Sequence, residues 1–189
     1  MSIEVTARQE PFPHAVTPAF FPPEIAEHAL NWLEASAPWK LHVEDFYEQH
    51  ECSLTTVELP DRLRTLVSPA AVRSYADAML TPIGAGEVEL VEATAHRLAG
   101  GQSIRIHNDY IEGAETHRLI VQLNREWEDV NGGFLMMFSS EDASDVARVL
   151  RPLHGSAVSF EISPRSFHAV SPTVKGERYT LVFSYRRLR

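Results

Sequence analysis

The chain has 189 residues, of which 44% are hydrophobic and 23% are charged, as is typical of one compact globular domain. The formal net charge of −9 leaves no basic excess to release counterions, which argues against a nucleic acid or an anionic membrane as the main partner. The single cysteine, Cys52, cannot form an internal disulfide, and neither a secretory signal nor a bilayer-spanning apolar run is evident. We therefore expect a cytoplasmic protein, whose oligomeric state the sequence leaves open.

The first 85 residues have the pattern of helices that support a sheet. After a proline-rich start, Pro23-Glu24 opens an amphipathic helix with apolar residues at helical spacing as far as Leu33. A second helical stretch is predicted over about residues 60–80. The segment 39–56 between the two has no clear pattern.

After Gly84, short segments rich in β-branched and aromatic residues alternate with turn signals. The predicted strands are 88–98, 103–107, 117–124, 133–138, 156–162, 167–170 and 178–186. Helices followed by strands indicate an α+β, mainly β, fold: a double-stranded β-helix (jelly roll) whose interior offers a pocket. We expect a single domain of residues 1–189, with 1–85 as a helical support region and 86–189 as the catalytic core.

Two of these strands have one apolar and one mixed face, because side chains alternate along a strand. The mixed faces comprise Arg118, Ile120 and Gln122 in the first strand and Arg178, Thr180, Val182 and Ser184 in the second. Parity alone leaves open whether the mixed faces meet water or line a polar cavity while the apolar faces pack against the helices.

The candidate metal-binding and anion-binding residues favour the second alternative, a polar cavity. His107 and Asp109 stand two apart at the end of a predicted strand, so both can reach one metal ion. His168 follows, and a hairpin between Pro172 and Gly176 would return Arg178 to the strand that carries His168. Each element alone is weak, since a histidine is more often structural than a ligand.

Together they form a specific pattern. Two histidines and one carboxylate make a facial triad that leaves positions open on Fe(II) for a 2-oxo acid and O₂. The far carboxylate of 2-oxoglutarate then needs a planar charged fork, which arginine supplies as a bidentate partner. The other histidines show no ligand spacing and are interpreted as surface or structural residues: 14, 28, 42, 50, 96, 117 and 154.

Five segments carry a family resemblance: GGQSIRIHND (100–109), LIVQLN (119–124), GGFLMMF (132–138), PLHGSAVSF (152–160) and FHAVSP…GERYTLVF (167–183). In this order and spacing they resemble the prolyl 4-hydroxylase-like branch of the 2-oxoglutarate/Fe(II) dioxygenases, over roughly residues 91–187. The resemblance implies His107, Asp109 and His168 as catalytic iron ligands. It also implies Arg178 as the co-substrate anchor, with the Thr180 hydroxyl assisting.

The resemblance further implies Fe(II), 2-oxoglutarate and O₂, with ascorbate as a candidate reductant. The reaction would hydroxylate a C–H bond of an amino-acid-like or peptidyl substrate and release succinate and CO₂. Asp109 favours hydroxylation over halogenation, because family halogenases replace that carboxylate. Two alternatives stay open: a cupin-like metalloenzyme that does not use 2-oxoglutarate, and a non-catalytic metal-binding module.

Some positions depart from the family pattern. Leu98 and Ile104 stand where prolyl 4-hydroxylases commonly carry tyrosines, and Arg118 aligns with a family threonine. A peptidyl-proline substrate is therefore not implied. Arg118 and Gln122 are predicted to bind co-substrate or substrate, since a second buried guanidinium needs an anion such as a substrate carboxylate. Arg118 pairing with Glu115 or another acidic side chain, or assisting 2-oxoglutarate, remains the alternative.

Overall fold

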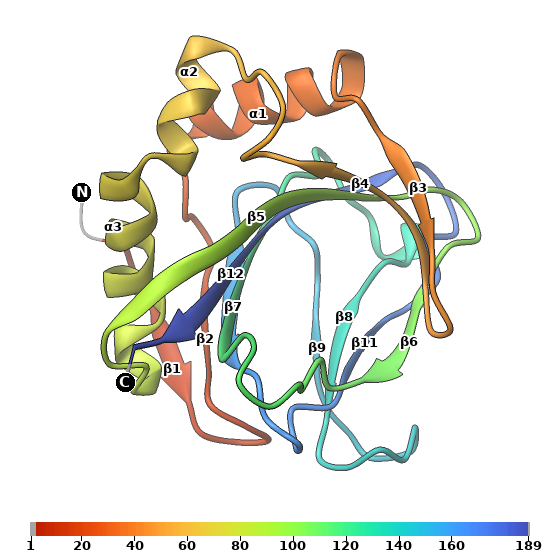
Figure 1. Cartoon of the computed structure of the whole chain (residues 1–189). Coiled ribbons are helices and arrows are strands. Elements are labelled where there is room, and N and C mark those ends of the chain that lie inside the picture. Colours follow the sequence, from red (N-terminus) through yellow and green to blue (C-terminus); the bar gives the residue numbers. More distant parts are fainter. Residues whose placement is uncertain (1–2, 189) are drawn as a thin grey trace.

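Two antiparallel sheets make up the body of the molecule (Figure 1), a computed structural model that describes residues 3–188 of the chain. The larger sheet contains, in spatial order, β1 (Thr6–Arg8), β2 (His14–Thr17), β10 (Ala157–Glu161), β7 (His117–Gln122), β12 (Arg178–Arg187), β5 (Val88–Leu98), β4 (Glu48–Ser53) and β3 (Lys40–Val43). The smaller sheet contains β6 (Ile104–His107), β11 (His168–Val170), β8 (Leu135–Phe138) and β9 (Val146–Leu150). The predicted mainly β fold, a double-stranded β-helix, is confirmed.

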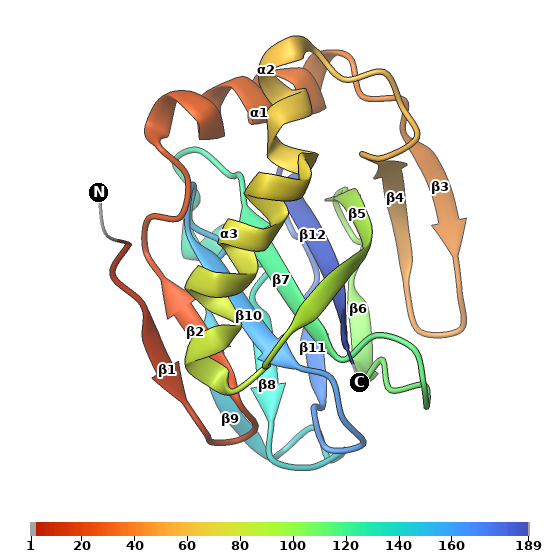
Figure 2. The ribbon, with the colours of Figure 1, turned by 60° about the vertical axis from the view of Figure 1, so that its left-hand side comes forward.

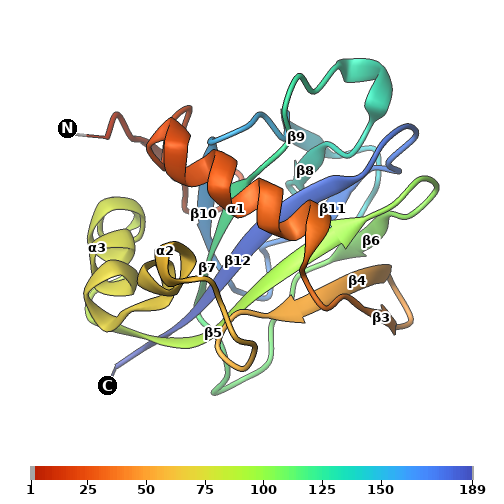
Figure 3. The same ribbon diagram turned by 90° about the horizontal axis from the view of Figure 1, so that it is seen from above.

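The helices lie on the outer face of the larger sheet: α1 (Pro23–Ala35), α2 (Asp61–Arg64) and α3 (Pro69–Met79) (Figures 2 and 3). The helix predicted over residues 60–80 is divided, because Ser68 precedes a proline and takes extended backbone angles there. The Ser68 hydroxyl instead caps α3, accepting a hydrogen bond from the backbone of Ala71. No helix within residues 3–188 is long and apolar enough to cross a membrane.

The outer face of the larger sheet forms one core with the helices. Leu119 and Val121 of β7 and Leu181 and Phe183 of β12 are buried there against helical residues such as Leu30. A second apolar cluster lies between the two sheets. The opposite, mixed faces of β7 and β12 therefore point inward. This agrees with the alternative in which they line a polar cavity.

Residues 1–85 contribute more than helices, which differs from the predicted support region. β1 and β2 extend one edge of the larger sheet, and the hairpin β3–β4 extends the other, where β4 pairs with β5. The hairpin arises from the segment 39–56 that has no clear pattern. Strand β9 is likewise absent from the predicted set, because none of its residues is buried and its apolar side chains do not alternate with polar ones.

The hairpin predicted between His168 and Arg178 is wrong. β11 pairs with β6 and β8 in the smaller sheet, whereas β12 pairs with β5 and β7 in the larger one. The connection around Pro172 therefore crosses between the sheets. His168 and Arg178 still face the same interior, His168 from the smaller sheet and Arg178 from the larger one.

One hydrogen bond ties β12 to the helical layer. The buried Tyr185 hydroxyl donates to the Val72 carbonyl of α3 over 2.9 Å. We expect Tyr185→Phe to lower the free energy of unfolding by about 0.5–1.5 kcal/mol, the net value of one such bond. Urea denaturation followed by circular dichroism measures this change.

Tyr75 gives a matched control for that measurement. Its ring packs against Phe183, but its hydroxyl has no hydrogen-bond partner within residues 3–188. Tyr75→Phe should therefore change stability less than Tyr185→Phe, and equal losses for the two variants would contradict the assigned role of the Tyr185 hydroxyl.

Candidate metal centre and co-substrate cavity

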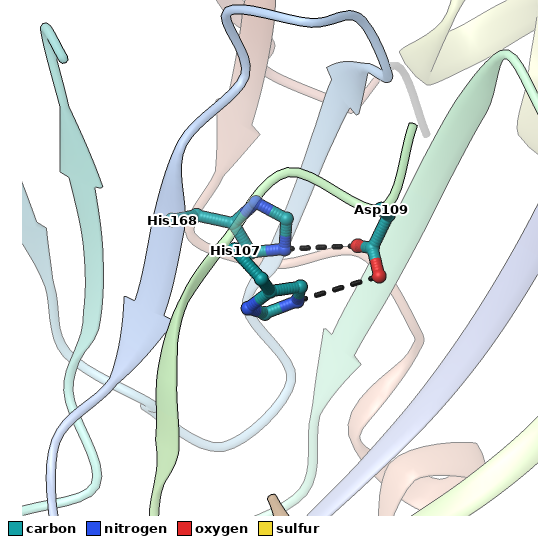
Figure 4. Close-up of side chains that lie close together, drawn as sticks. All are labelled: His107, Asp109 and His168. Carbon is teal, nitrogen blue, oxygen red and sulfur yellow. Dashed lines mark ion pairs between the residues drawn. The ribbon is translucent and has the colours of Figure 1, made fainter. Parts of the chain in front are cut away.

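Three side chains on the smaller sheet converge at one point: His107 at the end of β6, Asp109 just beyond it and His168 at the start of β11 (Figure 4). β6 and β11 pair with His107 opposite His168. Asp109 Oδ1 lies 3.3 Å from Nε2 of His107, and Oδ2 lies 3.0 Å from Nε2 of His168. One ligand atom from each residue lies within 4.8 Å of the others, a spacing that one metal ion can bridge.

A left-handed turn, rather than strand alternation, directs the Asp109 carboxylate. β6 ends at His107, and Asp109 has a φ of +57°, a conformation that aspartate tolerates better than most residues. Asn108 holds this turn, because its side chain accepts from the Tyr110 amide and donates to the Pro164 carbonyl. The carboxylate is thereby turned back toward both imidazoles.

Both histidines direct Nε2 at the carboxylate. Nδ1 of His107 lies 2.8 Å from the Arg105 carbonyl, and Nδ1 of His168 lies 2.8 Å from the Ser166 carbonyl, so each Nδ1 donates to a backbone carbonyl that fixes the ring. Burial lowers the pKa of His168 despite the carboxylate beside it. Both Nε2 atoms and the Asp109 carboxylate are thus directed at one point, where a bound cation could contact all three.

Arg118 connects this cluster to the larger sheet. Its guanidinium donates to Asp109 Oδ2 over 2.5 Å and to Glu115 Oε2 over 2.7 Å. Burial would raise the pKa of the Asp109 carboxyl, but the Arg118 charge and the two imidazoles outweigh burial and hold that pKa well below its usual value. Asp109 is therefore ionised at neutral pH, as a metal ligand must be.

The cluster opens into a cavity of about 250 Å³ between the sheets. Arg178 and Thr180 of β12 line it from the wall of the larger sheet. Arg178 is 3% exposed, and no residue within 3–188 gives its guanidinium an ion pair or a hydrogen bond. Burial lowers the pKa of Arg178 to about 10, so the side chain still carries its charge at neutral pH. An unpaired buried guanidinium indicates that an anion from outside the chain completes this site.

The comparisons with known proteins agree with this chemistry. The sequence model of the 2OG-Fe(II) oxygenase superfamily matches residues 93–186, about half of the chain. The chain belongs to this superfamily. It is thus a 2-oxoglutarate-dependent dioxygenase, and its family implies Fe(II), 2-oxoglutarate and O₂.

Solved structures of this kind share the fold at low sequence identity. A prolyl-4-hydroxylase from Pseudomonas putida matches with a TM-score of 0.74 and 19% identity, over 93% of this chain and 92% of that one. The prolyl hydroxylase of Trichoplax adhaerens, solved with a hypoxia inducible factor peptide, gives 0.74 and 14%, over 92% and 83%. HygX from Streptomyces hygroscopicus, solved with nickel, 2-oxoglutarate and hygromycin B, gives 0.63 and 13%, over 91% and 82%.

In this oxygenase the β3–β4 hairpin supplies cavity residues that sequence reasoning missed. Phe46, Tyr47, Gln49 and Glu51 line the cavity, and the Phe46 ring lies 4.6 Å from that of His107. Segment 39–56 has no periodic signal, since the turn side chains serve the cavity and β3 is exposed.

His96 was also missed, because it had been interpreted as surface or structural. It lines the cavity on β5, opposite Thr180 of β12, and its Nε2 lies 3.0 Å from the Thr94 hydroxyl. Burial lowers the pKa of His96 to about 4, so the ring is neutral at physiological pH. The available signal was strand alternation, which places His96 on the same face of β5 as Leu98, two residues later.

Arg118 and Gln122 differ in their hydrogen-bond partners and in whether they reach the cavity. Arg118 lines the cavity, but Asp109 and Glu115 engage both of its terminal nitrogens, so Arg118 does not need a substrate carboxylate as a partner. The alternative of acidic partners within the chain describes Arg118 instead. Gln122 is buried opposite Thr180 with an unpaired Oε1, and it does not reach the cavity lining.

Gly133 has a second role beside the tight turn expected for the Gly132-Gly133 pair. Both glycines have left-handed φ angles. A Cβ at Gly133 would lie 2.9 Å from Cδ of Arg178, so the absent side chain makes room for the stem of that arginine. Gly133 therefore helps to position the buried side chain of Arg178.

The unpaired charge of Arg178 should cost stability in the metal-free protein. Arg178→Met keeps an unbranched stem and removes the charge, so we expect the free energy of unfolding to rise by about 1 kcal/mol or more. Denaturation in the presence of a chelator and without 2-oxoglutarate measures this gain.

Arg97 provides the control, because it pairs with Glu177 over 3.4 Å and lies over the Trp39 ring. Arg97→Met should leave stability unchanged or lower it. If Arg178→Met destabilises the protein as much as Arg97→Met, the charge of Arg178 is compensated within the chain.

Proposed function

We propose that His107, Asp109 and His168 hold Fe(II), and that Arg178 binds the distal carboxylate of 2-oxoglutarate with help from Thr180. The observation that carries this proposal is an unpaired buried guanidinium in the same cavity as two Nε2 atoms and a carboxylate. The enzyme then hydroxylates a C–H bond of an amino-acid-like or peptidyl substrate and releases succinate and CO₂.

The bound iron and co-substrate supply the oxidising chemistry, in which decarboxylation of 2-oxoglutarate and reduction of O₂ accompany hydroxylation of the substrate. The chain supplies orientation and a dry interior. Arg178 fixes the co-substrate through a charge-assisted fork. Apolar residues on both walls exclude water around it: Ile104, Ile120, Leu135, Val170 and Val182.

Tyr47 compensates in this proposal for one departure from the family pattern. It forms an isolated β-bridge with Ile104, the position where a tyrosine is common in prolyl 4-hydroxylases, and both residues line the cavity. Burial and the neighbouring Glu51 raise the pKa of Tyr47 to about 12, so its hydroxyl keeps its proton and remains a donor. We also propose ascorbate as reductant and a cytoplasmic setting, in keeping with the free thiol of Cys52.

The cupin-like alternative and the non-catalytic module are not favoured. A cupin-like enzyme without 2-oxoglutarate gives the Arg178 charge no partner, although burial of an unpaired charge is costly. A non-catalytic module gives no reason to keep all three candidate ligands and the guanidinium together.

Arg178→Ala should raise the apparent 2-oxoglutarate constant by about ten- to a hundredfold, the value of a hydrogen bond to a charged partner. Affinity for the metal should remain nearly unchanged, because Arg178 lies on the wall opposite the triad. Thr180→Val should cause a smaller loss in the same direction. Titration of the anaerobic Fe(II) protein with 2-oxoglutarate, followed by absorbance, measures both.

Arg97→Ala serves as the control here, since Arg97 is absent from the cavity lining. An Arg178→Ala variant with the same 2-oxoglutarate dependence as Arg97→Ala would revive the cupin-like alternative.

Asp109→Ala should abolish divalent-metal binding and turnover while the protein stays folded, because Arg118 retains Glu115 as a partner. Calorimetric titration with Fe(II) or Ni(II) measures the metal, and circular dichroism measures folding. Asp77→Asn, an exposed carboxylate on α3, should leave both intact. Unfolding of Asp109→Ala in metal-free buffer would show that Asp109 is structural.

A further inference from the structure

The cavity has a cationic and an anionic end. Arg178 and Thr180 lie toward one end of β12, and Ser184 lies on the same face toward the other end. With a rise of roughly 3.3 Å per residue, about 20 Å of strand separates Arg178 from Ser184. The co-substrate anchor therefore leaves the Ser184 end free for a different ligand.

Polar groups without partners gather at the Ser184 end. Ser184 stands between Glu92 of β5 and Arg118 of β7 in the strand register, and all three side chains line the cavity. Ser184 is 4% exposed, and its hydroxyl has no hydrogen-bond partner within residues 3–188. Glu92 is a solvent-exposed residue of the cavity lining, and its carboxylate has neither an ion pair nor a hydrogen bond in the same part of the chain.

Burial raises the pKa of Glu92, and the like charges of Glu115 and Glu51 raise it further. These carboxylates come from β5, from the segment before β7 and from β4, so three different elements direct negative charge at one region. Arg118 offsets part of that charge, but it is already shared between Asp109 and Glu115.

The charge balance of the whole lining is negative. Four carboxylates face two guanidiniums, which leaves two negative charges when the imidazoles are neutral. The double charges of Fe(II) and of the 2-oxoglutarate dianion cancel, so the deficit persists in the loaded enzyme. Carboxylates only accept hydrogen bonds, so this end of the cavity favours a ligand that supplies donors.

We propose that Glu92, Ser184 and Glu115 bind a positively charged amine or guanidinium group of the substrate. This inference rests on the proposed function, since the charged group belongs to the molecule that is oxidised. A substrate carboxylate would be repelled here, and a neutral group would gain nothing from the negative charge of the carboxylates. The cavity of about 250 Å³ is shared with the co-substrate, which favours a slim aminoalkyl or guanidinoalkyl chain.

Such a chain belongs either to a free small molecule or to a basic residue of a peptide. Two matched pairs of probes distinguish these sources: butylguanidinium against butylurea, and acetyl-Gly-Arg-Gly-amide against its citrulline counterpart. Binding to the protein loaded with Ni(II) and 2-oxoglutarate is measured by calorimetry, without turnover. The pair with the tighter cationic member identifies the source.

The wild-type protein should bind the cationic member of a pair about tenfold or more tightly than the neutral one. Glu92→Gln should remove most of this preference, and Ser184→Ala should reduce it. Glu87→Gln removes the same charge from an exposed residue outside the cavity, so it should leave the preference intact.

Equal binding of charged and neutral probes would overturn the proposal. An equal preference for the cationic probe in Glu92→Gln and Glu87→Gln would do the same. So would the absence of saturable binding by both cationic probes. Separate titration of 2-oxoglutarate shows whether the proposed co-substrate binding or the cation site fails. Cation preference without 2-oxoglutarate binding would reject the proposed function and retain the cation site, whereas the reverse result would reject the cation site alone.

Discussion

The ion pair between Asp109 and Arg118 joins the two sheets at the point on which the site depends. Asp109 follows β6 and contacts both histidines of the smaller sheet, while Arg118 belongs to β7 in the larger one. The pair keeps the carboxylate ionised and fixes its distance from the opposite wall. Because the guanidinium is held on its other side by Glu115, its own orientation is also determined. The geometry of the triad is thereby coupled to the packing of the sheets.

The two cavity arginines show how the same side chain serves opposite purposes. Arg118 is neutralised by two carboxylates within the chain, so it organises the site without demanding a ligand. Arg178 has no such partner within residues 3–188, and its desolvated charge lowers the stability of the folded state. Natural enzymes tolerate such a loss of stability where a ligand of the reaction compensates the buried charge. The two arginines therefore differ in whether the chain itself neutralises them, which residue type alone does not reveal.

Much of this fold could be predicted from the sequence where periodicity was strong. β5 has the predicted bounds of residues 88–98, and β7 and β12 differ by only a few residues at their ends. Their alternation arises because one face packs on helices and the other lines the cavity. The hairpin of β3 and β4 could not be predicted, since β3 is exposed along its length and the cavity side chains of β4 are polar. The break at Ser68-Pro69 was readable in principle, because proline restricts the residue before it.

The sequence likewise predicted one part of the candidate site and not the other. The spacing of His107 and Asp109 predicted their proximity, although the physical reason is a left-handed turn and not strand alternation. The negative charge of the cavity could not be inferred, because Glu51, Glu92 and Glu115 are far apart in sequence and meet only through the strand order β7-β12-β5-β4. The partners of Arg118 were an open alternative that only the folded geometry could decide.

The β3–β4 hairpin has a consequence for how such an enzyme changes over evolution. It is one contiguous segment at the sheet edge, yet it contributes Phe46, Tyr47, Gln49 and Glu51 to the cavity. The triad and Arg178 come from residues 107–178, on other strands. Mutations of the hairpin that spare Phe46 and Tyr47 can therefore alter which molecules are accepted while the candidate metal ligands and Arg178 are inherited unchanged. Selection for a new substrate can thus act on a short stretch of the gene with little risk to the chemistry.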